Sequence, residues 1–125
     1  LNKNRSLYSN KALLRRSKAG KVAKKHLKKA SQYLNEDNSV AFYDALSNGV
    51  IGYLGNKFNI DLSDSGKENT KKILTDHKID NDTISEIISF IELCEIVRYA
   101  PTSISDSMNE SLIKAEQIIE KIERT

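Results

Sequence analysis

The most apolar and most aromatic segment of the chain is NSVAFYDALSNGVIGYLGNKF, residues 38–58. Its large apolar residues recur at steps of three and four, which places them on one face of an α-helix. They are Phe42, Leu46, Val50, Tyr53, Leu54 and Phe58. The spacing predicts a central core helix. Asn38 or Ser39 is expected to cap its start, because a short side-chain oxygen there accepts an otherwise unpartnered backbone N–H.

Three glycines, Gly49, Gly52 and Gly55, interrupt the same segment. Inside a helix each costs about 1 kcal/mol relative to alanine, so a packing reason is expected. The spacing is GxxGxxG rather than the GxGxxG of a dinucleotide-binding loop, and no strand pattern precedes it. We therefore expect these glycines to let a neighbouring helix approach closely rather than to hold a phosphate.

Four further segments have helical periodicity. Residues 10–35 carry a narrow seam of Ala23, Leu27, Ala30 and Leu34, and the short connection at residues 35–37 predicts an antiparallel hairpin with the central helix. Later helices are expected over residues 66–77, 83–100 and 106–124. Each of these three helices has a capping-box spacing at its start. In order, the pairs are Ser65 and Glu68, Thr83 and Glu86, and Ser107 and Glu110. Pro101 is expected to end the fourth helix.

The 125 residues are enough for one domain with one core. No long stretch alternates apolar with polar residues, so no sheet is predicted. The expected fold is all-α, a compact bundle of about five helices opening with a helical hairpin. Residues 1–9 lack a clear period and are expected to form a flexible arm, with residues 10–125 as the single helical domain.

No set of residues is typical of a catalytic centre or a metal site. Cys94 is the only cysteine, which excludes an intramolecular disulfide, and its position beside apolar residues predicts a core role. His26 and His77 lie on different predicted helices among lysines. We therefore expect no enzyme activity, no metal, no cofactor and no small-molecule substrate.

Charge is distributed very unevenly along the chain. Residues 1–29 hold eleven Lys or Arg and no Asp or Glu, whereas the remainder holds nine basic and seventeen acidic residues. One interpretation is contact with anionic lipid, which attracts basic segments beside a membrane. A second is nucleic-acid binding through phosphate contacts, and a third is an ordinary solvated helix face. The candidate residues for a membrane-surface contact are Lys3, Arg5, Lys11, Arg15, Arg16, Lys18 and Lys21.

The order of the segments resembles a known family. The basic run KAGKVAKKHLKKA, the AFYDALSNGVIGYLGNKF helix, the block ending in CEIVRYAP and a last amphipathic helix are together similar to the C-terminal cytoplasmic part of BatD-type aerotolerance proteins. The resemblance covers residues 15–122 and is clearest in CEIVRYAP, residues 94–101.

The resemblance implies a bacterial inner-membrane protein with an exported portion and one membrane span, both outside these 125 residues. This domain would lie on the cytoplasmic side, with residues 1–9 as a juxtamembrane arm. Its expected role is a non-catalytic adaptor in stress or oxygen tolerance. The implied partners are MoxR-type AAA+ ATPases and von Willebrand factor A domain proteins, with no nucleic acid expected. The alternative remains a nucleic-acid-binding module that uses the basic helix.

Within CEIVRYAP, three residues form a candidate docking edge for a partner, because Arg and Tyr are enriched where interfaces concentrate their energy. These residues are Arg98, Tyr99 and Pro101. A purely structural interpretation is favoured over the docking edge. Arg98 follows Glu95 by three residues, which suits an ion pair within the helix, and Tyr99 could be a half-buried residue at the edge of the core.

Overall fold

The computed structural model describes residues 3–62, 66–99 and 108–124, and within them the side chains of residues 16–62, 66–97 and 108–124. Five helices make up this part of the chain, and it contains no strand. They are α1 (Lys3–Asn35), α2 (Ser39–Phe58), α3 (Lys67–Asp76), α4 (Asn81–Tyr99) and α5 (Met108–Glu123). The predicted all-α fold is confirmed.

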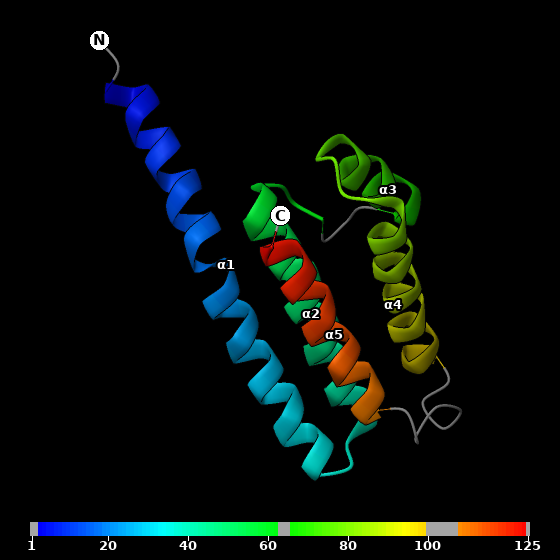
Figure 1. Cartoon of the computed structure of the whole chain (residues 1–125). Helices are drawn as coiled ribbons and strands as arrows, with labels where there is room; N and C mark the ends of the chain where they lie inside the picture. Colours follow the sequence, from blue (N-terminus) through cyan, green and yellow to red (C-terminus); the bar gives the residue numbers. More distant parts are fainter. Residues whose placement is uncertain (1–2, 63–65, 100–107, 125) are drawn as a thin grey trace.

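Helices α2 and α5 lie side by side in the middle of the bundle (Figure 1). Helix α1 packs along both of them on one side, α4 packs against both on the opposite side, and α3 packs on α4. The most extensive packing is between α1 and α2, which run antiparallel and form the predicted hairpin. As a result, the outer surfaces of α1 and α4 face away from each other.

Helix α1 is much longer than its partner. Its 33 residues span about 50 Å and the 20 residues of α2 about 30 Å, so α1 continues well past the other helices in Figure 1. It begins at Lys3 rather than at Asn10, inside the segment expected to be an arm. Neither Pro nor Gly occurs between residues 3 and 19, so no residue there breaks the backbone hydrogen bonding of the helix.

The core follows the predicted pattern. The stripe on α2 is buried from Phe42 to Leu54, while Phe58 at its end is half-buried. Ala23 and Ala30 of α1 are buried in the same core. Because these α1 residues are small, α1 and α2 pack closely. At the start of α2, the Asn38 side chain caps the helix by accepting the Ala41 N–H at 3.3 Å. The choice between Asn38 and Ser39 is thereby settled for Asn38.

The glycine prediction is correct at one position and wrong at another. A Cβ at Gly49 would lie 3.0 Å from the Cβ of His26, so α1 does approach α2 closely there. A Cβ at Gly52 would have no atom within 4 Å, and Gly52 is exposed. Three residues turn a helix through about 300°, so each glycine in the series points about 60° away from the previous one. One neighbouring helix cannot face all three.

The start of α4 also differs from its prediction. Asp80, not Thr83, is the capping residue, since its carboxylate accepts the Thr83 N–H at 3.1 Å and the Thr83 hydroxyl at 2.7 Å. Glu86 does not complete a capping box, because its carboxylate binds the Lys121 ammonium at 2.8 Å. At α3 the cap is Gly66 without a side-chain bond. The proposed caps Ser65 and Ser107 lie outside the described residues.

Candidate functional site

Four exposed lysines form a straight row on α1, which we call the lysine stripe. Its members are Lys18, Lys21, Lys25 and Lys28. Their steps of three, four and three place them on one helix face, over about 15 Å of helix length. The opposite face of α1 is buried against α2 and α5 through Ala19, Ala23 and Ala30. The stripe therefore points directly away from the core.

Nothing on α1 neutralises this stripe, since residues 1–29 contain no Asp or Glu. Within the described side chains, no ion pair or hydrogen bond engages these four ammonium groups. Long aliphatic stems let the ammonium groups reach outward while the stems lie along the helix surface. The arrangement can attract a surface of phosphate or other anionic groups.

The predicted membrane-surface residues are only partly placed. Arg16, Lys18 and Lys21 are exposed on α1. Lys3, Arg5, Lys11 and Arg15 belong to the same helix, but their side chains lie outside the described part. The sequence prediction missed Lys25 and Lys28, although their steps of seven and ten from Lys18 could have identified them as members of the same face.

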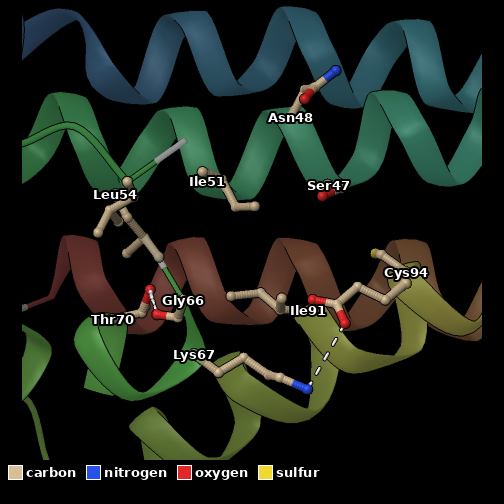
Figure 2. A pocket seen from close by; sticks show the side chains of 11 residues that line it. Ser47, Asn48, Ile51, Leu54, Gly66, Lys67, Thr70, Ile91 and Cys94 are labelled. Atoms are coloured by element: carbon tan, nitrogen blue, oxygen red, sulfur yellow. Dashed lines mark hydrogen bonds and ion pairs between the residues drawn. The ribbon is translucent and has the colours of Figure 1, made fainter. Parts of the chain in front are cut away.

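A second surface feature lies on the other side of the bundle, between α2 and α4. Two hollows of about 350 and 340 Å³ are both lined by Cys94, and we call the two together the α2–α4 groove. Its α2 wall includes Val40, Asp44, Ser47, Ile51 and Leu54. Its α4 wall includes Ile91, Cys94, Glu95 and Val97. Figure 2 shows Ser47 and Ile51 on one side of the first hollow and Ile91 and Cys94 on the other.

The rim of this groove is charged. Lys67, from the start of α3, is labelled in Figure 2. Its ammonium lies 3.5 Å from a carboxylate oxygen of Glu92 and 3.8 Å from one of Glu95. The two glutamate side chains are 50% and 47% exposed, so these ion pairs are open to solvent and weak. Apolar surface is also open nearby, since Val40 is 50% and Ile96 51% exposed.

The predicted docking edge lies at one end of this groove. Arg98 and Tyr99 are the last residues of α4, but their side chains, and Pro101 as a whole, lie outside the described residues. Neither the docking role nor the Glu95–Arg98 ion pair is therefore tested. The preceding residue, Val97, is buried and lines the second hollow.

The remaining chemical candidates occupy structural positions. Cys94 is buried in the α4 wall of the groove. His26 packs against Gly49, and the ring of His77 lies 4.5 Å from that of Phe58, centroid to centroid. The described side chains contain no group of three or more His, Cys, Asp or Glu that could hold a metal ion. None of the helices, over their described residues, combines the length and the apolar character needed to cross a membrane.

Comparisons with known proteins do not extend this description. The chain matches no protein-family model, and searches of curated proteins and of solved structures found no significant match. The resemblance to BatD-type proteins therefore stays a prediction from the sequence.

Proposed function

We propose that this chain is a non-catalytic adaptor domain that binds an anionic membrane surface through the lysine stripe and presents the α4 side of the bundle to partner proteins. The observation that carries the proposal is the opposite placement of the two features. The stripe lies on the outer face of α1, and the α2–α4 groove lies on the side of the bundle where α4 packs. A surface that covers α1 would leave the groove accessible.

The strength of the lipid contact follows from the number of lysines. Each Lys near an anionic leaflet contributes about 1 kcal/mol, so the four described lysines contribute about 4 kcal/mol, a factor of about a thousand in partitioning. That is enough to orient a domain that is already tethered nearby, and too little to hold an untethered one firmly. The contact should weaken steeply with salt, because exposed charges are screened.

The proposed setting is the cytoplasmic face of a bacterial inner membrane, in a BatD-like protein of an oxygen- or stress-tolerance system. The partners would be a MoxR-type AAA+ ATPase and von Willebrand factor A domain proteins. The support is the order of the sequence segments, from the basic run to CEIVRYAP, together with an all-α fold that displays two separate surfaces.

Vesicle co-sedimentation tests the membrane contact. We expect the domain to bind vesicles of phosphatidylglycerol and phosphatidylcholine, and not phosphatidylcholine alone. Lys21→Gln with Lys25→Gln should lower the partition coefficient by about 30-fold, the equivalent of two lysines. The matched control is Lys71→Gln with Lys72→Gln, which removes the same charge from exposed positions of α3 and should leave binding almost unchanged. Equal losses in the two variants would contradict the role of the stripe.

A competition experiment distinguishes membrane binding from the alternative, nucleic-acid binding by the basic helix. Lipid binding and DNA binding both weaken with salt, so salt dependence alone does not distinguish them. Duplex DNA added to vesicle-bound domain should leave most of it bound. Displacement at equal phosphate concentration, with a DNA affinity that depends on Lys21 and Lys25, would replace the membrane proposal with the nucleic-acid one.

A further inference from the structure

The two walls of the α2–α4 groove have the spacing of a helix-packing seam. Val40, Asp44, Ser47, Ile51 and Leu54 of α2 follow steps of four, three, four and three. On the α4 wall, Ile91, Cys94 and Val97 follow steps of three. Rows with this spacing are typical of helix packing, and the members that keep surface for a third helix are Val40, Asp44, Ile51 and Ile91. Ser47, Leu54, Cys94 and Val97 are already buried within the bundle.

The bundle already contains a helix packed against this same pair. Helix α5 contacts both α2 and α4, and its ribbon is seen between theirs in Figure 2. Its buried residues follow steps of three, four, three and four. They are Met108, Ser111, Ala115, Ile118 and Ile122. No residue of α5 lines the groove. The first hollow is also bounded by Leu62 and by Gly66, Lys67 and Thr70 at the start of α3, and the rest of the groove is a second position of the same kind.

We propose that the α2–α4 groove binds one amphipathic helix of a partner protein, with aliphatic anchors at steps of three and four and with Lys or Arg beside them. Val40 and Ile51, the first and last groove residues of α2 that keep exposed surface, lie about 17 Å apart along the helix, which corresponds to a bound helix of at least about 11 residues. Helix-in-groove recognition of this kind uses a few aliphatic anchors to supply most of the binding energy.

The charges at the rim of the groove indicate which charge the partner helix should carry. Glu92 and Glu95 on the α4 side are about half exposed, and the two carboxylates share a single ammonium group, that of Lys67, which leaves this part of the rim negatively charged. Among the described side chains that line the two hollows, Lys67 is the single basic one. Basic residues on the incoming helix would therefore find complementary charge, which favours association and selects against acidic helices.

This inference rests on the adaptor role proposed above, but not on the lipid contact. Its test uses two synthetic peptides of about 14 residues with the same Leu seam, one flanked by Lys and one by Glu, added to ¹⁵N-labelled domain without lipid. We expect the Lys peptide to bind and to shift the backbone amide signals of Ile51, Ile91 and Cys94. A third peptide with Ser in place of Leu should not bind.

Charge reversal at exposed positions tests the surface without disturbing the core. Glu92→Lys with Glu95→Lys should weaken the Lys peptide by about tenfold or more and strengthen the Glu peptide. Glu110→Lys with Glu116→Lys makes the same charge change at exposed positions of α5 and should have little effect. Equal binding of both peptides, signal changes confined to other helices, or no binding of the Lys peptide would overturn the proposal.

The two proposals fail separately in these experiments. The variant Lys21→Gln with Lys25→Gln should lose vesicles and keep the peptide, whereas Glu92→Lys with Glu95→Lys should keep vesicles and lose the Lys peptide. A wild-type domain that binds the Lys peptide but no anionic vesicles would contradict the membrane contact alone, and a wild-type domain that binds vesicles but not the Lys peptide would contradict the groove alone.

Discussion

The Tyr53 hydroxyl donates a 2.6 Å hydrogen bond to the Glu123 carboxylate, which joins the middle of α2 to the last turn of α5. The same carboxylate accepts a hydrogen bond from the Lys57 ammonium at 2.8 Å. It also lies against α1, since a Cβ at Gly20 would be 2.9 Å from Glu123 Oε1. Burial, and then the bond to Glu123, raises the pKa of Tyr53 far above its usual value, so the phenol stays protonated and remains a donor.

Removing the Tyr53 hydroxyl tests this junction directly. Tyr53 is only 1% exposed, and Tyr53→Phe should lower the free energy of unfolding by about 1–2 kcal/mol, because it removes a hydrogen bond to a charged group. A double-mutant cycle with Glu123→Gln, measured by urea denaturation, should give a coupling free energy of about 1 kcal/mol. Additive effects would show that the two side chains act independently.

The same carboxylate predicts a pH dependence. Hydrogen bonds from Lys57 and then Tyr53 hold the pKa of Glu123 below its ordinary value of 4.5. A carboxyl whose pKa is lower in the folded state contributes stability above its unfolded pKa and loses it as the pH falls through the folded pKa. The stability difference between wild type and Glu123→Gln should therefore be largest near neutral pH and shrink below pH 4.5. Glu116→Gln, at an exposed position of α5, serves as the control; a constant difference for Glu123→Gln would contradict this role.

Two glycines of α2 form a matched pair for a packing test. Gly52→Ala should raise the free energy of unfolding by about 0.5–1 kcal/mol, because alanine favours a helix and meets no atom within 4 Å. Gly49→Ala has the same helical benefit but places its Cβ 3.0 Å from the Cβ of His26, an atom fixed to the backbone of α1. Denaturation should show Gly49→Ala to be less stable than Gly52→Ala by about 1 kcal/mol or more. Equal stabilities would mean that α1 can move aside freely.

The cap of α4 provides a further test. Asp80→Ala should cost about 1 kcal/mol, because it removes the acceptor of both Thr83 hydrogen bonds. Glu86→Ala should cost less than about 0.5 kcal/mol, since it breaks an exposed ion pair with Lys121 rather than a cap. Thermal unfolding of the two variants should show this order. The reverse order would restore Glu86 to the capping role that its spacing suggested.

The fold could be predicted from the sequence where burial alone decides position. The apolar stripe on α2 and the seam of alanines and leucines on α1 were predicted because apolar residues at steps of three and four must share a buried face. The helix starts were less predictable. Asp80, Thr83 and Glu86 all have side chains that suit a cap, and only tertiary packing determines that Glu86 is occupied by Lys121.

The lysine stripe and the α2–α4 groove differ in how far they could be predicted from the sequence. The basic segment was evident from composition, and the steps of three and four between its lysines could have identified the lysine stripe, but the prediction did not include Lys25 and Lys28. The α2–α4 groove was not predicted, because it arises from residues on helices far apart in the sequence, such as Ile51 and Ile91. Three of its α2 residues, Asp44, Ser47 and Ile51, lie off the predicted core stripe and gave no apolar signal strong enough to notice.

The single thiol of this chain, that of Cys94, lines both hollows of the groove. The Cys94 side chain is only 4% exposed, so local opening between α2 and α4 should speed its reaction with a thiol reagent, and the labelling rate should report on that opening. No engineered probe is needed, because the chain contains no other cysteine. A helix bound in the groove would slow the reaction of the Cys94 thiol. The labelling rate would therefore report both on binding in the groove and on the internal motion of the bundle.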